Sequence, residues 1–154
     1  KMQLNSKFDV LRGWPKEGAL DETFTVYAPG GTPVELPSGT VIYKRTDNTV
    51  DKADTPNRTT TNGVAVWVVV EGNDDYSGSF LNKVVAIRAN AMIKLDPDNF
   101  TAAALPAGTK LTMQSGVFAA AVANDQIIAE VVTDDQAVDG TITIYYTGGD
   151  TLML

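Results

Sequence analysis

The acidic side chains are the main candidates for chemistry in this 154-residue chain, which has 19 Asp and Glu, no His and no Cys. The absence of His removes the usual general base near neutral pH, the Ser-His-Asp triad and the commonest ligand of transition metals. The absence of Cys removes disulfides, thiolate nucleophiles and Cys-ligated zinc or iron–sulfur sites. The composition therefore argues against most enzymes. We expect no catalytic residue, no cofactor and no metal ion.

One acidic segment, Asp96-Pro97-Asp98-Asn99, has the spacing of a calcium loop, with three oxygen-bearing side chains in four residues. The glycine and the distant glutamate that complete such a loop are missing, so we expect Asp98 or Asn99 to cap a helix instead. The adjacent acids Asp74-Asp75 and Asp134-Asp135 could pair as catalytic carboxylates or bind a cation. Because they lie in turn-rich loops, we expect them to be solvated.

The net charge is −7, from 12 Lys and Arg against 19 Asp and Glu. A surface of this sign repels phosphate backbones, so binding to nucleic acid is not expected. The longest apolar runs, residues 64–70 and 117–123, are far shorter than the about 18 residues that a membrane helix needs, so no membrane association is expected. The first residues also lack the apolar core of a signal peptide. We expect one soluble domain, since a chain of this length buries roughly 70 % of its unfolded surface.

The elements that carry these side chains are expected to be strands, because 17 Val, 7 Ile and 18 Thr favour a pleated surface over a helix. Short β-rich segments separated by Gly, Pro, Asn and Asp are typical of a sandwich or small barrel. Gln114-Ser115-Gly116-Val117 predicts a tight hairpin turn. The predicted strands are residues 24–27, 40–45, 64–70, 84–89, 92–95, 110–114, 117–121, 127–133 and 141–146.

One segment, residues 98–105, has a capping residue, good helix formers and a stop at Pro106, and predicts a helix of about two turns. A helix this short has no stability of its own, so we expect it to pack against a sheet through Phe100 and Leu105. The polar, turn-rich residues 47–62 are expected to form an exposed loop, and residues 71–80 a second, acidic one.

The first 23 residues differ from the rest, because their large apolar side chains follow neither a period of two nor one of 3.6. Such a segment predicts an extended arm. Because six large apolar side chains are not expected to stay exposed to water, the arm either packs along its own domain or lies on a neighbouring protein, and we favour the neighbour. The candidate contact residues of the arm are Met2, Leu4, Phe8, Val10, Leu11 and Trp14.

A five-residue pattern occurs twice, as Leu36-Pro37-Ser38-Gly39-Thr40 and, 69 positions later, as Leu105-Pro106-Ala107-Gly108-Thr109. Pro fixes φ, Gly supplies a conformation that a Cβ would obstruct, and Thr starts an extended run, so each copy predicts a turn into a strand. Two such turns indicate quasi-equivalent corners of one barrel. A solenoid would need more copies.

From residue 33 to residue 146 the order of features resembles the head decoration proteins of tailed bacteriophages, the lambda decoration protein-like, capsid-stabilising family. A Gly-Thr turn leads into Val41-Ile42-Tyr43-Lys44, and a polar loop, the Val-rich strand 64–70 and an acidic loop follow. Next come the strand 83–88, the Ala-rich segment with its Leu-Pro-Ala-Gly-Thr exit, and two closing strands.

The resemblance implies a small β-barrel or β-tulip-like domain with one short α-helix and an extended N-terminal arm. It divides the chain into an arm, residues 1–23, and a decoration domain, residues 24–154. It also implies a homotrimer on the outer surface of the virion, where it would clamp neighbouring subunits of the major capsid protein. The arm is similar to the N-terminal segments with which such proteins reach the capsid. No enzymatic activity is implied.

Two further interpretations remain open at this stage. Arg88, in an apolar strand, needs an acidic partner in its own domain or in a neighbouring subunit at a trimer interface. The aromatic residues Trp67, Tyr76, Tyr145 and Tyr146 could form a sugar-stacking platform, which would make the chain a carbohydrate-binding or adhesive domain. Because Tyr145 and Tyr146 point to opposite faces of a strand, only one of them can join such a platform.

Overall fold

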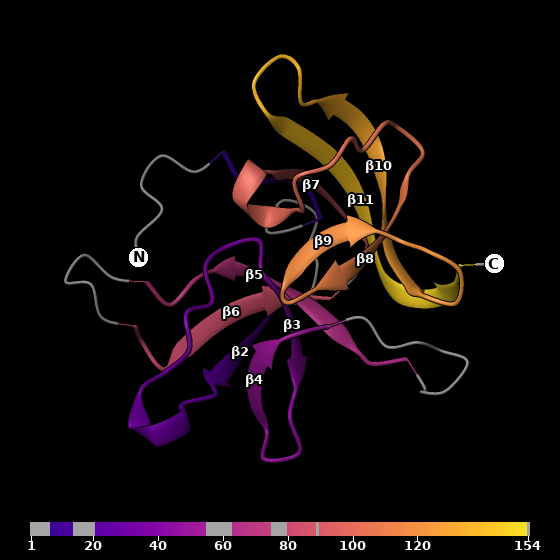
Figure 1. Cartoon of the computed structure of the whole chain (residues 1–154). Helices are drawn as coiled ribbons and strands as arrows, with labels where there is room; N and C mark the ends of the chain where they lie inside the picture. Colours follow the sequence, from indigo (N-terminus) through magenta and orange to yellow (C-terminus); the bar gives the residue numbers. More distant parts are fainter. Residues whose placement is uncertain (1–6, 14–20, 55–62, 75–79, 89, 154) are drawn as a thin grey trace.

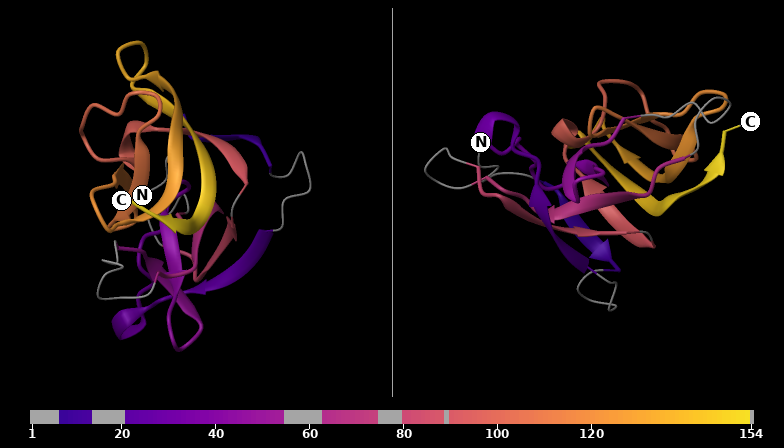
Figure 2. Two further views of the ribbon diagram at one scale, coloured as in Figure 1. Left: turned by 90° about the vertical axis from the view of Figure 1, so that its right-hand side faces the viewer. Right: turned by 90° about the horizontal axis from the view of Figure 1, so that it is seen from below.

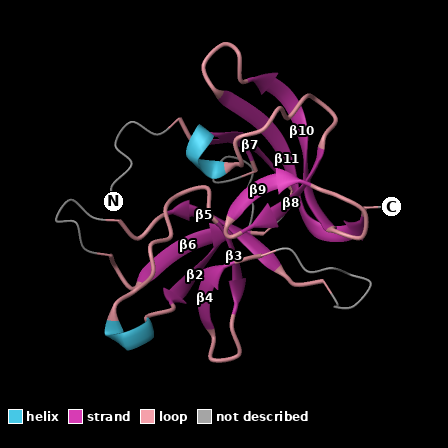
Figure 3. Cartoon of the chain, viewed as in Figure 1, coloured by secondary structure: helices cyan, strands magenta, loops and turns pink. Residues whose placement is uncertain are grey.

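The computed structural model of the chain describes residues 7–13, 21–54, 63–74, 80–88 and 90–153. These residues form strands and two three-residue 3₁₀ helices, so the expected mainly β fold is confirmed (Figure 3). No helix among them is long and apolar enough to cross a membrane. The elements in chain order are β1 (Asp9–Arg12), β2 (Asp21–Val26), η1 (Pro29–Gly31), β3 (Val41–Lys44), β4 (Thr49–Lys52), β5 (Val66–Glu71), β6 (Lys83–Ile87), β7 (Ala91–Leu95), η2 (Pro97–Asn99), β8 (Lys110–Gln114), β9 (Val117–Ala120), β10 (Gln126–Asp135) and β11 (Thr141–Leu152).

The strands form two sheets that lie side by side (Figures 1 and 2). One is a closed ring in the order β2-β4-β3-β5-β6. Its closure is uneven, because β2 and β4 run parallel and pair only at Thr25–Thr49 and Val26–Val50. The other is a six-stranded antiparallel sheet in the order β1-β7-β11-β10-β8-β9.

Each of the nine predicted strands corresponds to an observed strand, and the predicted hairpin turn between β8 and β9 is confirmed. Ser115 and Gly116 have φ values of 50° and 85°, the left-handed pair that a tight turn of this kind needs. The prediction of an exposed loop over residues 47–62 is wrong for β4, which pairs with β3 inside that range. Val50 is the signal that was missed, because this single buried side chain anchors an otherwise polar strand.

The predicted short α-helix over residues 98–105 is wrong. The segment holds the 3₁₀ helix η2, and then Phe100 takes an extended conformation and bridges in parallel to Phe118 of β9. A capping box holds the start of η2, since Asp96 Oδ1 accepts from the backbone N–H of Asp98 and Asn99 Oδ1 accepts from that of Asp96. The helix ends where the extended Phe100 bridges to β9. Phe100 and Leu105 do pack into the core, as expected, but from an extended chain.

The chain contains the same arrangement of strands twice. A first unit, β2 to β6, has a strand, a 3₁₀ helix, the Leu-Pro-x-Gly-Thr turn, a hairpin and two further strands. A second unit, β7 to β11, repeats this order. The pairing agrees as well: β5 is bulged between Val69 and Glu71 against β6, and β10 is bulged at the corresponding place, between Val131 and Thr133, against β11. The prediction that the two repeated turns are corners of one barrel is therefore wrong, because the first leads into β3 of the closed ring and the second into β8 of the six-stranded sheet.

The two turns share their hydrogen bonds as well as their sequence. The Thr40 hydroxyl and backbone N–H donate to Pro37 O at 2.7 and 3.1 Å, and Thr109 makes the same two bonds to Pro106 O at the same distances. The middle glycine has φ of 90° in the first turn and 91° in the second. Since a β-branched or bulky residue avoids this region, the turn requires Gly at this place.

The interiors of the two units are built from matching positions. Those of the first unit form one hydrophobic cluster, and their counterparts belong to a second, larger cluster. The corresponding pairs, taken from the strand registers and the repeated turn, are Phe24 and Leu95, Leu36 and Leu105, Ile42 and Leu111, Val50 and Phe118, Val69 and Val131, Val84 and Ile142, and Ala86 and Ile144.

The N-terminal segment adds a strand that the first unit does not have. β1 pairs antiparallel with β7, and Val10, which faces Ile93 across the ladder, is buried in the larger cluster. Phe8 packs against the same cluster and is half-buried. Within residues 7–13 of the predicted arm the chain therefore packs on its own protein, and residues 21–23 of that arm already belong to β2.

Candidate functional site

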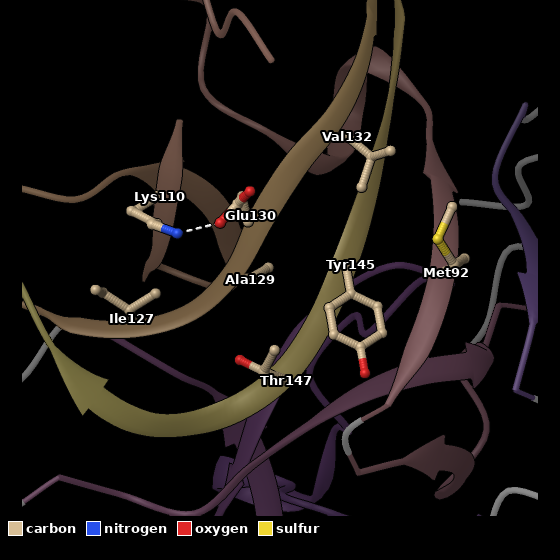
Figure 4. Close-up of a pocket in the computed structure, with 8 residues that line it drawn as sticks. All are labelled: Met92, Lys110, Ile127, Ala129, Glu130, Val132, Tyr145 and Thr147. Atoms are coloured by element: carbon tan, nitrogen blue, oxygen red, sulfur yellow. Dashed lines mark hydrogen bonds and ion pairs between the residues drawn. The ribbon is translucent and has the colours of Figure 1, made fainter. Parts of the chain in front are cut away.

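The second unit presents an open face on the six-stranded sheet. A hollow of about 460 Å³ lies on it (Figure 4). Val132, at the bulge of β10, is 42 % exposed, and Tyr145 of β11 is 41 % exposed, so large apolar side chains border this hollow. The residues that line it, here called the open face, are Met92, Lys110, Ile127, Ala129, Glu130, Val132, Tyr145 and Thr147.

A row of directly paired residues crosses the open face. Lys110 of β8 pairs with Glu130 of β10. Glu130 pairs in turn with Tyr145 of β11, and Tyr145 with Met92 of β7. Directly paired residues share one face of a sheet, so these four side chains stand together. Lys110 Nζ and Glu130 Oε1 form an ion pair, and the Tyr145 hydroxyl donates to Asn90 Oδ1 at 3.3 Å.

The charged groups of the open face satisfy each other. The Lys110 and Glu130 side chains are a little under half exposed, so water screens the pair and limits its contribution to stability. Around this pair the face is apolar, which suits contact with another surface that buries Val132, Tyr145 and Met92. Burial of a large apolar side chain contributes roughly 1.5–3 kcal/mol.

The acidic residues that the sequence marked as candidate ligands act mainly as turn caps. The predicted capping role is confirmed for Asn99, which completes the capping box of η2, but the N-cap is Asp96 and not Asp98, whose backbone N–H donates to it. Asp134 accepts from the backbone of Gln136, and three successive backbone N–H groups donate to the carbonyl oxygen of Asp135. Among the described residues no three His, Cys, Asp or Glu side chains gather as a metal site would require.

Two Asp side chains, one in each unit, have pKa values below the usual range. At Asp139 the main cause is the hydroxyl of Thr141, which donates at 2.6 Å, followed by the Thr141 backbone N–H. At Asp47 the hydroxyl and N–H of Thr49 lower the pKa in the same way. Asp74 differs: its carboxylate oxygens are buried, so the expectation that it is solvated is wrong, and this burial raises the pKa of the carboxyl group. Its neighbour Asp75 lies outside the described residues. Hydrogen bonds to the charged form explain the two lowered values.

The structure separates the predicted arm residues. Val10 is buried in the protein's own core, Phe8 packs beside it, and Leu11 is half-buried in β1. Met2, Leu4 and Trp14 lie outside the described residues.

The candidate interface residue Arg88 is exposed, and its guanidinium carbon lies 5.5 Å from the centre of the Trp67 ring. Within the described part of the chain Arg88 forms no ion pair, so an aromatic face takes the place of the expected acidic partner. Its role at a subunit interface stays a prediction. Trp67 itself packs edge-on against Phe24 at 5.1 Å.

The proposed aromatic platform is not assembled among the described residues. Tyr146 is fully buried and donates from its hydroxyl to Val66 O at 2.8 Å, while Tyr145 is exposed on the other face of β11, as strand alternation requires. Trp67 is packed against the core of the first unit, and Tyr76 lies outside the described residues. Tyr145 is therefore the one exposed aromatic of the set that the structure describes.

Two amide side chains that sequence reasoning missed hold the repeated turns. Asn73 Oδ1 accepts from Leu36 N at 2.8 Å, and Gln136 Oε1 accepts from Leu105 N at 2.9 Å. Their amide nitrogens donate to the carbonyl two residues earlier in each case, Val34 O and Ala103 O. An amide residue just after the third strand that follows each turn was the available signal.

Comparisons with family models, with curated proteins and with solved structures gave no match for this chain.

Proposed function

We propose that the protein is a structural component of a tailed-phage head, which binds the outside of the capsid and stabilises it by clamping neighbouring subunits of the major capsid protein. The observation that carries the proposal is the open face: apolar side chains border a hollow, and the charges beside it are already paired. Such a face offers contact area to another subunit, as the homotrimer included in the proposal requires. The order of turns and strands from residue 33 to residue 146 adds the resemblance to head decoration proteins.

The build of the molecule supports a load-bearing role. The first unit is closed by strand pairing, and its buried residues Val41, Val68 and Ile87 belong to the same hydrophobic cluster as the interior of the second unit, so the two units pack firmly on each other. A homotrimer on the outer surface of the virion, as the resemblance implies, is part of the proposal. Its capsid contacts are assigned to the arm residues Met2, Leu4 and Trp14, since Val10 is taken by the protein's own core.

The test measures binding of the purified chain to expanded phage heads that lack it, taken from the phage that encodes the chain. The full chain is expected to co-sediment with the heads, to saturate at a number comparable to the capsid subunits, and to raise the temperature at which the heads break open. Trp14→Ala is expected to weaken attachment by more than tenfold, because truncating a buried aromatic anchor often costs above about 2 kcal/mol. Leu81→Ala, an exposed apolar change outside the arm, is the matched control.

Absence of saturable binding, or binding in a few copies at the tail alone, would overturn the proposal. A glycan array provides the contrasting readout. Clear, saturable binding to one glycan without association with heads would instead assign the chain to carbohydrate-binding or adhesive domains.

A further inference from the structure

The row of paired residues on the open face has a counterpart in the first unit, where it is covered. Val41 of β3 pairs with Val68 of β5, and Val68 pairs with Ile87 of β6. All three are fully buried in the cluster that contains the interior of the second unit. By their places in the two ladders, their counterparts are Lys110, Glu130 and Tyr145. The same row of three positions is thus buried in the first unit and exposed in the second.

The repeated turn shows the same contrast. Asn99 Nδ2, from η2 of the second unit, donates to Ser38 O in the first turn at 3.0 Å. A Cβ on Gly39 would stand only 2.4 Å from that nitrogen, so η2 covers this turn closely. At the corresponding Gly108 a Cβ would meet nothing within 4 Å.

The part of the second unit that covers the first includes the tip of the β8–β9 hairpin as well as η2. Gly116 donates from its backbone N–H to Ala53 O at 2.8 Å, and Gly116 O accepts from Val41 N at 2.8 Å. Beside it, Ser115 N donates to Asp54 Oδ1 at 3.3 Å. The hairpin tip therefore extends the edge of the first unit.

The equivalent covering parts of the first unit are exposed. η1 contains no buried residue, and Thr46, Asp47 and Asn48 of the β3–β4 turn are all exposed. In Figure 1 this turn projects at the bottom, away from the second unit. Each unit thus has a receiving surface, the row of paired strand residues, and an inserting surface, the hairpin turn with the 3₁₀ helix. Within the chain, the inserting surface of the second unit covers the receiving surface of the first. The receiving surface of the second unit and the inserting surface of the first remain exposed.

We propose that the open face receives a second copy of this chain, whose β3–β4 turn and η1 dock as the β8–β9 hairpin and η2 dock within one chain. Copies then associate head to tail. The inference rests on the repeated fold and not on binding to a capsid, although it specifies the contact for the self-association included above.

The apolar surface on the receiving side agrees with this occupant. Of the five large apolar side chains that are exposed among the described residues, Val122, Val132 and Tyr145 lie on or beside the receiving surface. Val122, which is 66 % exposed, is the counterpart of Asp54, since Ala121 N bonds to Lys110 O as Ala53 N bonds to Val41 O. An interface between unlike surfaces forms a ring if its rotation closes, and a filament if it does not.

Cysteine cross-linking between two single variants tests the geometry, because the chain has no native Cys. Ser115 and Asp54 are in contact within one chain, and their counterparts in the proposed contact between copies are Thr46 and Val122. The two variants are therefore Thr46→Cys and Val122→Cys. Mixed under mild oxidation, these two variants are expected to form a heterodimeric disulfide at least tenfold faster than Thr46→Cys mixed with Val138→Cys. Val138 is 84 % exposed in the turn before β11 and does not line the open face, so it controls for random collision. A chain with both Ser115→Cys and Asp54→Cys is the internal positive control.

Each other result contradicts the proposal. Equal rates for the two mixtures would mean that the contact is random. Faster cross-linking of Val122→Cys with itself would mean that two open faces meet each other instead.

A second measurement uses association without cross-linking. In analytical ultracentrifugation Val132→Asp is expected to weaken self-association by roughly tenfold or more, because a charge replaces an apolar side chain that the contact buries. Val138→Asp, the same change outside the face, is expected to leave it unchanged. Monomers of the native chain at all concentrations would overturn the inference and leave decoration of heads, tested separately through the arm, unaffected.

Discussion

Val68 in the first unit and Glu130 in the second occupy the same place in the same ladder, but Val68 is fully buried and Glu130 is half exposed. Inside the units no such contrast exists. Ile42 and Leu111, for example, correspond and are both fully buried. The fold thus dictates the residue type at interior positions, and the neighbour dictates it at outer positions.

The two repeated turns show the same contrast between residues set by the fold and surroundings set by the neighbour. Both keep Pro, Gly and Thr, because these residues make the turn itself. Their surroundings differ, since η2 covers Gly39, whereas no described residue comes within 4 Å of a Cβ built on Gly108. Paired variants at corresponding positions therefore separate the contribution of the fold from the contribution of the neighbour.

The largest effect is expected at Phe118, which corresponds to Val50. Phe118 is fully buried, packs edge-on against Tyr146 at 6.4 Å and bridges to Phe100. Phe118→Ala is expected to lower the free energy of unfolding by about 3–5 kcal/mol, and Val50→Ala, which removes fewer buried groups, by about 2 kcal/mol. Urea unfolding monitored by circular dichroism checks both. Equal losses would show that the interiors of the two units do not differ in the way the structure indicates.

The amides that hold the two turns come next. Asn73 is fully buried and makes three hydrogen bonds, to Leu36 N, Val34 O and Leu81 O, so Asn73→Ala is expected to cost about 3 kcal/mol. Gln136 makes two such bonds at a half-buried site, and Gln136→Ala is expected to cost about 1 kcal/mol. Thermal unfolding of the two variants measures the difference. A greater loss for Gln136→Ala would reverse the order of burial on which the comparison depends.

Local patterns in the sequence predict much of this fold and little of its sites. Nine strands and the Ser115-Gly116 turn follow from β-branched runs and turn residues, which act over a few positions. β1 and β4 could not be predicted, because each is anchored by a single buried side chain, Val10 and Val50, in an otherwise polar or half-exposed segment. The helix over residues 98–105 failed because a tertiary bridge from Phe100 to Phe118 outweighed good helix formers.

The open face could not be predicted for a similar reason. Lys110, Glu130 and Tyr145 lie in three strands, and only the strand register brings them into one row. The repeated turn was visible in the sequence, but the duplication of whole units was not. Corresponding interior positions such as Val50 and Phe118 share hydrophobicity without sharing identity.

The middle glycines of the two turns give a smaller but cleaner comparison. Gly39→Ala and Gly108→Ala both place a side chain at φ near 90°, which costs on the order of 1 kcal/mol. Gly39→Ala must also displace Asn99, whose side chain caps η2 and bonds to Ser38 O, and is expected to cost about 2 kcal/mol in total. The difference in unfolding free energy reports how firmly the second unit sits on the first. Identical losses would mean that η2 moves away freely.

The smallest effect is expected on the pKa of Asp139, compared between the variants Thr141→Val and Lys94→Gln. Thr141 holds the pKa of Asp139 down more strongly through its hydroxyl bond than Lys94 does by charge from 3.6 Å. Thr141→Val is therefore expected to raise the pKa of Asp139 toward 3.8 by more than Lys94→Gln does, and to leave Asp47 unchanged. Carbon-detected NMR titration of the Asp carboxyl groups measures these values. A larger rise with Lys94→Gln would make charge, and not the hydroxyl bond, the main cause.

The sign of the pH dependence follows from the same bonds. A carboxyl whose pKa is lower in the folded than in the unfolded chain stabilises the fold above the unfolded value, and this contribution is lost as the pH falls through the folded value. For Asp139 and Asp47 the loss therefore begins near pH 3.8 and continues below it. Thr141→Val, which removes the hydroxyl bond to Asp139, is expected to reduce the loss of unfolding free energy as the pH falls. Thr49→Val is expected to do the same through Asp47, to which the Thr49 hydroxyl also donates at 2.6 Å. Acid unfolding curves that stay parallel to that of the native chain in both variants would contradict the assignment of these two hydroxyl groups.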